Sequence, residues 1–313
     1  MFGVLIALLT TLSWSIGIFP FTEASKRLGT ATLNQYRLLL AWIIISILIL
    51  IFYPISIYGL FGVPHLNHYL FLGLSGVIGF TIGDYFTFSS FKLIGPRLGS
   101  LYYTFSPAAA LLAGFFLLEQ KINFIGVIGI FVTIGGVIWL TLSKKDKAVS
   151  AEVGFKRDPK GILFGIIGAL CQGLGLVFSK LGMDSYSDKL PTLHAVWIRL
   201  LFAFGAAFTI SVFTGRIKST AAPVFKNQNN GLPYLVIGTF FGPVLGVTLS
   251  LLTIQYLEVA AAQTIFSLLP VMVLPINYFY YKEKITSQAV LGSVIAVLGV
   301  FILIWRNSIS GWI

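Results

Sequence analysis

The feature that most constrains this chain is a series of ten apolar runs, each about twenty residues long. An α-helix rises 1.5 Å per residue, so roughly 20 apolar residues cross a hydrocarbon core of about 30 Å. Transmembrane β-barrels instead read as alternating segments of about ten residues. The sequence therefore predicts an all-α membrane protein with ten transmembrane helices, near residues 2–20, 34–53, 69–91, 97–118, 123–142, 161–181, 193–213, 232–254, 260–281 and 286–305.

The charge content supports the same class. Only 10% of the residues are charged, whereas soluble domains carry about 25%, which excludes a water-soluble enzyme and a nucleic-acid binder. The excess of 21 Lys and Arg over 10 Asp and Glu fits loops that face anionic lipid headgroups. We therefore expect an integral protein of the cell (inner) membrane whose partners are membrane lipids and a small-molecule substrate.

The chain divides into two similar halves. Residues 143–160 form a polar linker with six basic and three acidic residues, between a first five-helix repeat at 1–142 and a second at 161–306. Shared membrane composition is the alternative explanation for the likeness, but six identities keep one offset of 163 residues. They relate Gly79, Gly83, Pro107, Lys121, Gly129 and Gly136 to Gly242, Gly246, Pro270, Lys284, Gly292 and Gly299.

An odd number of helices in each half has a topological consequence. The second half must enter the membrane from the opposite side, so the two repeats are inverted. Inverted repeats place a substrate site near the bilayer midplane at the repeat interface, and rocking about that site gives alternating access. The architecture by itself therefore predicts transport.

Several sequence stretches resemble a known family. They are LSWSIG in the first helix, YRLLLAW and IRLLFAF at the starts of helices two and seven, FKLIGPRLGSLYYTFSP with its partner IQYLEVAAAQTIFSLLP, and the loop from Glu283 to Thr286. The chain resembles the drug/metabolite transporter superfamily, in its ten-helix branch with two EamA-like domains. The resemblance implies efflux of amino acids, other metabolites or toxic compounds, and some relatives move sugar nucleotides or lipid-linked groups. Two departures are Gln172, which matches Trp14, and one extra residue in the loop from Glu119 to Ile122.

Asp84 is the only acidic residue deep inside an apolar run. An ionised carboxylate at the bilayer centre costs about 3 kcal/mol on insertion scales, so it faces the bundle interior or a water-filled cavity. Such a group suits proton binding or a cationic substrate. A purely structural partner for Arg37 or Lys92 is the alternative, and the position matching Asp84 in the second half is Val247.

Three basic residues are candidates for binding an anion. Arg37 and Arg199 hold matched positions one turn inside helices two and seven, and guanidinium groups suit carboxylates. The favoured alternative is that they extend to the headgroups or tie down a neighbouring helix. Lys180 lies where the resemblance implies a lysine near the end of the first helix of a repeat, and an interfacial role is equally open.

Helices four and nine share a small and polar face. At the spacing i, i+4, i+7 one side of each helix carries matched residues, namely Ser100, Thr104 and Pro107 with Gln263, Ser267 and Pro270. We expect Ser100, Thr104, Gln263 and Ser267 to line a central cavity, although such residues also allow close helix packing. Tyr103 neighbours this face, and Trp14 and Gln172 are matched points on helices one and six that complete the predicted substrate site.

These features favour a secondary transporter that exports a small metabolite, amino acid or toxic compound, with coupling to protons or another ion or as a facilitator. No GxxxxGK[ST] motif is present, so nucleotide-driven pumping and a bound cofactor are not expected. The alternatives are a carrier or flippase for a nucleotide- or lipid-linked group and, from another class, a membrane enzyme acting on lipid. The sequence holds no HExxH motif and no second intramembrane aspartate, so we do not expect an enzyme.

The charge distribution also predicts an orientation. Loops after odd-numbered helices hold 15 Lys and Arg, against 4 in the termini and the other loops. By the positive-inside rule both termini face outward and the 143–160 linker is cytoplasmic, whereas the family resemblance implies the reverse. Labelling of a cysteine introduced at Ser150 by a membrane-impermeant reagent in intact cells would contradict the charge-based orientation.

Overall fold

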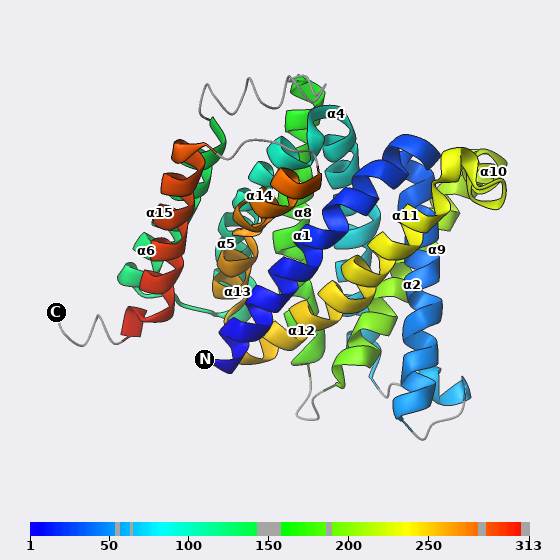
Figure 1. Cartoon of the computed structure of the whole chain (residues 1–313). Helices are drawn as coiled ribbons and strands as arrows, with labels where there is room; N and C mark the ends of the chain where they lie inside the picture. The colour runs from blue at the N-terminus through cyan, green and yellow to red at the C-terminus, as the bar shows by residue number, and fades with distance from the viewer. Residues whose placement is uncertain (54–56, 63–64, 143–157, 186–189, 281–285, 308–313) are drawn as a thin grey trace.

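The computed structural model describes residues 1–53, 57–62, 65–142, 158–185, 190–280 and 286–307, and every regular element in these ranges is helical (Figure 1). The first half holds α1 (Phe2–Leu28), α2 (Thr30–Phe52), α3 (Leu66–Gly76), α4 (Asp84–Tyr102), α5 (Ser106–Leu118) and α6 (Phe124–Leu142). The second half holds α8 (Pro159–Met183), α9 (Thr192–Phe213), α10 (Ile217–Phe225), α11 (Leu232–Thr239), α12 (Val247–Tyr256), α13 (Val259–Phe266), α14 (Leu269–Tyr280) and α15 (Ser287–Ile304). The predicted all-α fold is confirmed.

Among the described residues, eight helical stretches are long and apolar enough to cross a bilayer. Two shorter apolar helices, Phe124–Trp139 and Val290–Ile304, account for the remaining predicted runs. The eight stretches are Phe2–Leu28, Thr30–Phe52, Leu66–Pro96, Leu98–Leu118, Pro159–Met183, Thr192–Phe213, Leu232–Tyr256 and Val259–Ile276. Ser150, residues 143–157 of the linker and the loop residues Glu283 to Ile285 lie outside the described residues.

Glycine and proline set the breaks between helices of the first half. Gly29 separates α1 from α2 with φ 92°, a conformation that glycine adopts without a Cβ penalty. Gly95, with φ 82° and followed by Pro96, bends α4 sharply. Proline has no backbone N–H to continue the helix, so the third span ends here and the fourth begins, as the sequence predicts.

Both halves contain a π-helical segment at the matching position. Val77–Gly83 lies between α3 and α4, and Phe240–Gly246 lies between α11 and α12. The two segments begin and end at the same offset of 163 residues that relates the sequence identities. Short π-helical turns occur frequently at functional sites, and both of these segments border the cavity described below.

The first helix of each half packs against the other half. In the first half α1 packs against α11 and α12 of the second half, and α8 packs against α3 and α4 of the first. The pairs α2 with α9 and α6 with α15 complete the arrangement, and Figure 1 shows α6 and α15 side by side at one edge of the bundle. This reciprocal packing places the interface between the halves at the centre of the molecule.

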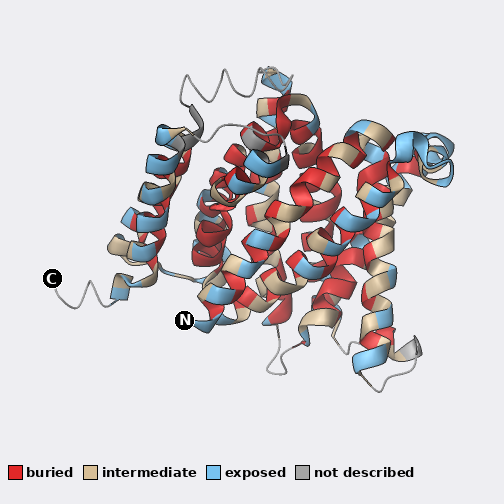
Figure 2. Ribbon diagram, viewed as in Figure 1, coloured by how far each residue is buried: buried red, intermediate tan, exposed pale blue. Residues whose placement is uncertain are grey.

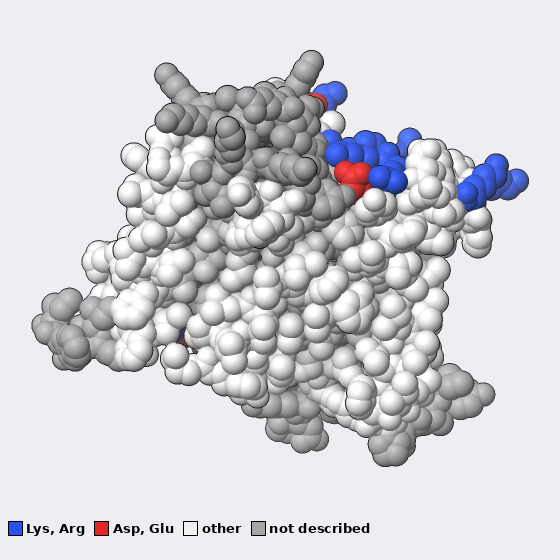
Figure 3. Space-filling view, in the orientation of Figure 1, with Lys and Arg blue, Asp and Glu red and all other residues white. Residues whose placement is uncertain are grey.

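Burial follows the pattern of a membrane protein. Large apolar side chains such as Phe116, Phe124 and Phe213 are exposed on the outside, while polar residues and Arg37 are buried inside (Figure 2). In Figure 3 the visible Lys and Arg gather at one end, near the end of α1 and α10, and the broad middle of this face lacks charge. The charged end carries Lys26 and Arg27, which pair with Glu23. The orientation of this end stays a prediction.

Candidate functional site

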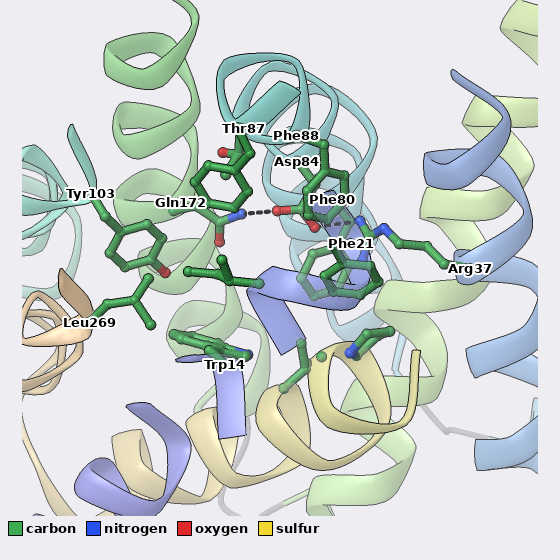
Figure 4. Close-up of a pocket in the computed structure, with 15 residues that line it drawn as sticks. Trp14, Phe21, Arg37, Phe80, Asp84, Thr87, Phe88, Tyr103, Gln172 and Leu269 are labelled. Carbon is green, nitrogen blue, oxygen red and sulfur yellow. Dashed lines mark hydrogen bonds and ion pairs between the residues drawn. The ribbon is translucent and has the colours of Figure 1, made fainter. Parts of the chain in front are cut away.

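A cavity of about 70 Å³ lies between the two halves and is called the central cavity here. Its walls come from α1, α2, the first π-helical segment and α4, and on the other side from α8, the second π-helical segment, α12 and α14. Its lining includes Trp14, Arg37, Asp84, Tyr103 and Gln172 (Figure 4). Five residues from the sequence prediction are thus brought together around one space.

Asp84 is the only acidic side chain of this lining. It begins α4 directly after the first π-helical segment. Nη2 of Arg37 donates a hydrogen bond to Oδ2 of Asp84, and Nε2 of Gln172 donates to Oδ1. Figure 4 shows the carboxylate between these two donors, which come from α2 and α8. The carboxylate therefore joins the two halves at the cavity wall.

Arg37 is almost completely buried, with 2% of its surface exposed. Besides Asp84, its guanidinium donates to Oδ1 of Asn34 over 2.8 Å from Nη2 and lies 4.7 Å from the ring centre of Phe88. Asn34 is itself fixed by a bond from Nδ2 to the Thr81 carbonyl oxygen, at 2.9 Å. Arg37 does not extend to the headgroups, because its partners lie inside the bundle.

Trp14 forms part of an aromatic wall. Its ring packs edge to face with Tyr103 at 6.0 Å and with Phe266 at 5.1 Å between ring centres. The indole approaches the second π-helical segment so closely that a Cβ atom on Gly246 would lie 2.3 Å from its Nε1. Only glycine leaves room for the indole at this position.

Equivalent positions of the two halves meet at the wall of the central cavity. Three matched pairs line it: Trp14 with Gln172, Phe80 with Pro243, and Asp84 with Val247. The positions are equivalent, but the side chains differ in polarity at the first and third pairs and in size and shape at the second. The scaffold is therefore close to symmetric, while the chemistry of the wall is not.

With this geometry described, comparison with known proteins assigns the chain to a family. The model of the EamA-like transporter family matches residues 1–142 and 159–305. The chain belongs to this family. It is an integral protein of the cell membrane, and its family lies within the drug/metabolite transporter superfamily that the sequence resembles.

Individual relatives are more distant. An "Uncharacterized transporter" of Clostridium kluyveri is 29% identical over 189 residues, covering 59% of this chain and 56% of that protein. Another from Haemophilus influenzae is 26% identical over 168 residues, covering 54% of this chain and 52% of that protein. The chain thus spans about half the length of these curated relatives. A solved crystal structure with 16% sequence identity and a TM-score of 0.68, covering 97% of this chain and 98% of that chain, has the same fold.

The second arginine of this EamA-like chain has no ion pair. Arg199 is buried, with 3% exposed, and its guanidinium lies 4.2 Å from the ring centre of Phe80. Its Nε has no hydrogen-bond partner, and no ion pair joins it to any residue in the described part of the chain. It does not line the central cavity. A headgroup position does not describe this buried side chain, whereas its contact with Phe80 joins α9 to the first π-helical segment, as the helix-tie alternative expects.

The small and polar face of helices four and nine does not reach the central cavity. Ser100, Thr104, Gln263 and Ser267 are at most 1% exposed, and none lines the cavity. The hydroxyls of Thr104 and Ser267 donate to carbonyls of their own helices, at 2.7 Å each. Gln263 lies one layer further out, where its Nε2 donates to the Gln172 carbonyl oxygen at 3.2 Å. In this conformation the four residues pack helices together, and their contact with substrate stays a prediction.

Lys180 lies away from the cavity as well. Its Nζ forms an ion pair of 3.0 Å with Asp184, one turn further along the end of α8. An exposed pair of this spacing contributes about 0.3–0.5 kcal/mol. The geometry therefore matches the interfacial alternative rather than a place in the central cavity.

The sequence prediction did not include four residues around Asp84 that line the central cavity. They are Phe80 of the first π-helical segment and Thr87, Phe88 and Phe91 of α4. Phe80 and Phe88 lie four residues before and after Asp84, so all three share one helix face. This spacing around a lone intramembrane carboxylate is a signal that would have identified both phenylalanines.

Proposed function

We propose that the chain is a secondary transporter that exports a small metabolite, amino acid or toxic compound by alternating access about the central cavity. Membership of the EamA-like transporter family supports transport in general. The direction and the solute class are our inference from the cavity and from the resemblance to an export family. Asp84, Arg37, Gln172, Trp14 and Tyr103 are proposed to contact the substrate.

The observation that carries the proposal is the buried cluster of Asp84, Arg37 and Gln172 at the cavity wall. Buried charges are expensive in a membrane and mark substrate or ion pathways. A merely structural ion pair would gain nothing from facing an open space between the two halves. A pair that a solute or proton can reach is able to respond to its binding.

The packing supplies a route for alternating access. One group of helices is α1 with α11 and α12, and the other is α8 with α3 and α4. The central cavity lies between them, and the bonds from Arg37 and Gln172 to Asp84 connect elements of both halves. Rocking of one group against the other would open the cavity toward each side of the membrane in turn.

Charge and size restrict the solute. In the described part of the chain the buried ionisable side chains with a formal charge are Arg37, Asp84 and Arg199, which leave one positive charge uncompensated. A cavity of about 70 Å³ corresponds to the liquid volume of roughly two water molecules. We therefore favour a small solute with a carboxylate or another anionic group, and amino acids have this chemistry.

The test has two stages. Metabolite profiles of cells with and without the protein identify solutes that accumulate inside when it is absent. Each candidate is then loaded into vesicles containing the purified protein, and unaltered solute is measured outside. Appearance of a chemically changed product, or equal release from vesicles containing Asp84→Asn, would contradict the proposal.

A further inference from the structure

A second and larger cavity of about 250 Å³ lies at the edge of the bundle and is called the perimeter cavity. It is bounded by the first turns of α2, the start of α4, the end of α9 and the beginning of α10. Its walls include Gln35, Thr81, Tyr85, Ile210, Ser211 and Arg216. It shares no lining residue with the central cavity.

The perimeter cavity opens toward the lipid. Ile82 and Tyr85 are each 40% exposed and Ile210 is 53% exposed, and all three belong to helical stretches long enough to span the bilayer. Exposed apolar side chains in spanning helices face hydrocarbon. A molecule entering beside them comes from the bilayer rather than from bulk water.

The inner wall offers hydrogen bonds that the protein does not use itself. Gln35 is 2% exposed, and its Nε2 has no hydrogen-bond partner among the described residues. A buried donor without a partner is costly, so an occupant with acceptor oxygens would relieve this cost. The hydroxyls of Ser211 and Thr220, which bond to each other at 3.1 Å, add polar surface to the same cavity.

Arg216 supplies a basic group to the lining of the perimeter cavity. Arg216 follows the end of α9 at Phe213 by three residues, is exposed, and forms no ion pair with a described residue. It lies at the end of the bundle where Figure 3 shows Lys and Arg gathered. An exposed guanidinium just beyond the end of a spanning helix suits an anionic phosphate group.

We propose that the perimeter cavity binds the headgroup of an anionic phospholipid. The phosphate lies between Arg216 and Gln35, and the acyl chains extend outside along Ile82, Tyr85 and Ile210. Gln35, Ser211 and Thr220 supply polar groups on the inner wall, and the volume fits a headgroup such as phosphoglycerol, whereas two acyl chains are too large for the enclosed space.

The site is connected to the central cavity through one side chain. Asn34 lines the perimeter cavity, and its Oδ1 accepts the hydrogen bonds of Arg37, the partner of Asp84. A headgroup that packs against Asn34 therefore favours the arrangement in which Arg37 is held. The lipid site and its binding do not depend on the proposed transport function.

The test uses the full chain purified in detergent, stripped of lipid and titrated with phosphatidylglycerol or phosphatidylcholine, with bound lipid counted by native mass spectrometry. We expect tighter binding of phosphatidylglycerol. Arg216→Gln should weaken it about fivefold, because one basic group near the headgroup is lost. The matched control is Lys218→Gln, which removes an exposed charge of α10 outside the cavity lining and should leave binding unchanged.

A third variant separates the cavity from surface charge. Ala207→Trp fills the perimeter cavity without altering any charge and should also abolish the preference for phosphatidylglycerol, with folding checked by thermal unfolding. Gln35→Leu serves as a milder replacement if Ala207→Trp does not fold. Equal losses for Arg216→Gln and Lys218→Gln, or an unchanged preference when the cavity is filled or Gln35 is replaced, would overturn the proposal.

Discussion

The two halves of the molecule provide the central cavity with nearly the same backbone and very different side chains. Asp84 of the first half and Val247 of the second hold equivalent positions in the lining of the central cavity, and Trp14 of α1 corresponds in the same way to Gln172 of α8. The repeated packing gives both halves equivalent places at the interface. The difference teaches that the fold supplies a symmetric frame for rocking, while recognition is carried by an unequal set of groups.

The matched arginines express the same contrast. Arg37 has a carboxylate, an amide oxygen and a phenylalanine ring around its guanidinium. Arg199 has a phenylalanine ring and an unpaired Nε. One arginine is thus in a direct ion pair within the protein, whereas the other makes no direct ion pair with a described residue. The predictions below test this comparison, beginning with the largest effect.

Replacing Asp84 by Asn should reduce transport to background, because the cavity then lacks its carboxylate and Arg37 loses its counter-ion. Any pH dependence of transport that comes from titration of the Asp84 carboxyl should be lost in Asp84→Asn. Asp84→Glu keeps a carboxyl and should keep part of the transport activity. The measurement is release of the identified solute from vesicles over a range of pH. Val247→Ala alters the matched position without touching a charge and should retain transport within about threefold. Normal transport by Asp84→Asn across the pH range would disprove a central role.

The stability of these variants separates the two arginines. Arg37→Gln leaves the Asp84 charge buried without its partner and should lower the free energy of unfolding by about 3–5 kcal/mol. Arg199→Gln breaks no ion pair with a described residue and should leave stability unchanged or raised, while transport of an anionic solute should fall about tenfold because one buried positive charge is lost. Thermal unfolding in detergent and vesicle assays measure both. Similar stability losses for the two variants would remove the contrast.

A double variant isolates the ion pair itself. Asp84→Asn combined with Arg37→Gln removes both charges, so it should be more stable than Arg37→Gln alone and still be inactive. Because Arg37 pairs with Asp84, Asp84→Asn alone should lose stability that the second substitution recovers. Additive losses in the double variant would mean that the two side chains do not interact energetically.

Gln172→Leu should have a smaller effect. It removes the hydrogen bond from Nε2 to Asp84, and interhelical bonds of this kind in membranes contribute about 0.6 kcal/mol, at most about 1.7. We expect a modest loss of stability and a partial loss of transport, since Arg37 still holds the carboxylate. Gln263→Leu, which removes the bond to the Gln172 carbonyl oxygen and the bond accepted from the Ser106 hydroxyl, is the comparison. A larger transport defect in Gln263→Leu would indicate that the layer outside the cavity matters more.

The smallest effect is expected at the polar face of helix four. Thr104→Val removes a hydroxyl that bonds only to the Leu101 carbonyl oxygen and should leave transport within about twofold, with a stability change below roughly 1 kcal/mol. Thr87→Val removes a hydroxyl from the cavity lining and should reduce transport more. Both are assayed in the same vesicles. A stronger defect for Thr104→Val would restore the sequence-based view that this face contacts the substrate.

Much of the fold could be predicted because hydrophobic length is a local property. The ten apolar runs and the break at Gly95 and Pro96 are visible in the sequence, and all ten runs contain helices in the structure. The depth of Asp84 marked it as an interior residue, and Arg37 was named as a candidate partner. These inferences required only the cost of charge in lipid.

The sequence alone could not show which side of the fourth and ninth helices faces the central cavity. Ser100 and Thr104 follow the bend at Gly95, which resets the direction of the helix, and their neighbour Tyr103 faces the central cavity instead. Side-chain polarity did not decide between cavity and packing, because a hydroxyl can satisfy itself on its own helix. The π-helical segments also have no distinct sequence signal, and they determine how Phe80 and Asp84 face the cavity.

The matching positions of the two π-helical segments are also informative about how this chain arose. A π-helical turn is wider than an α-helical one, and Val77–Gly83 and Phe240–Gly246 occupy corresponding places. One ancestral five-helix unit that already had the widened turn, followed by gene duplication, accounts for both with a single change. On this account Asp84 and Val247 diverged after the duplication, because equivalent positions of the two copies were then identical at first.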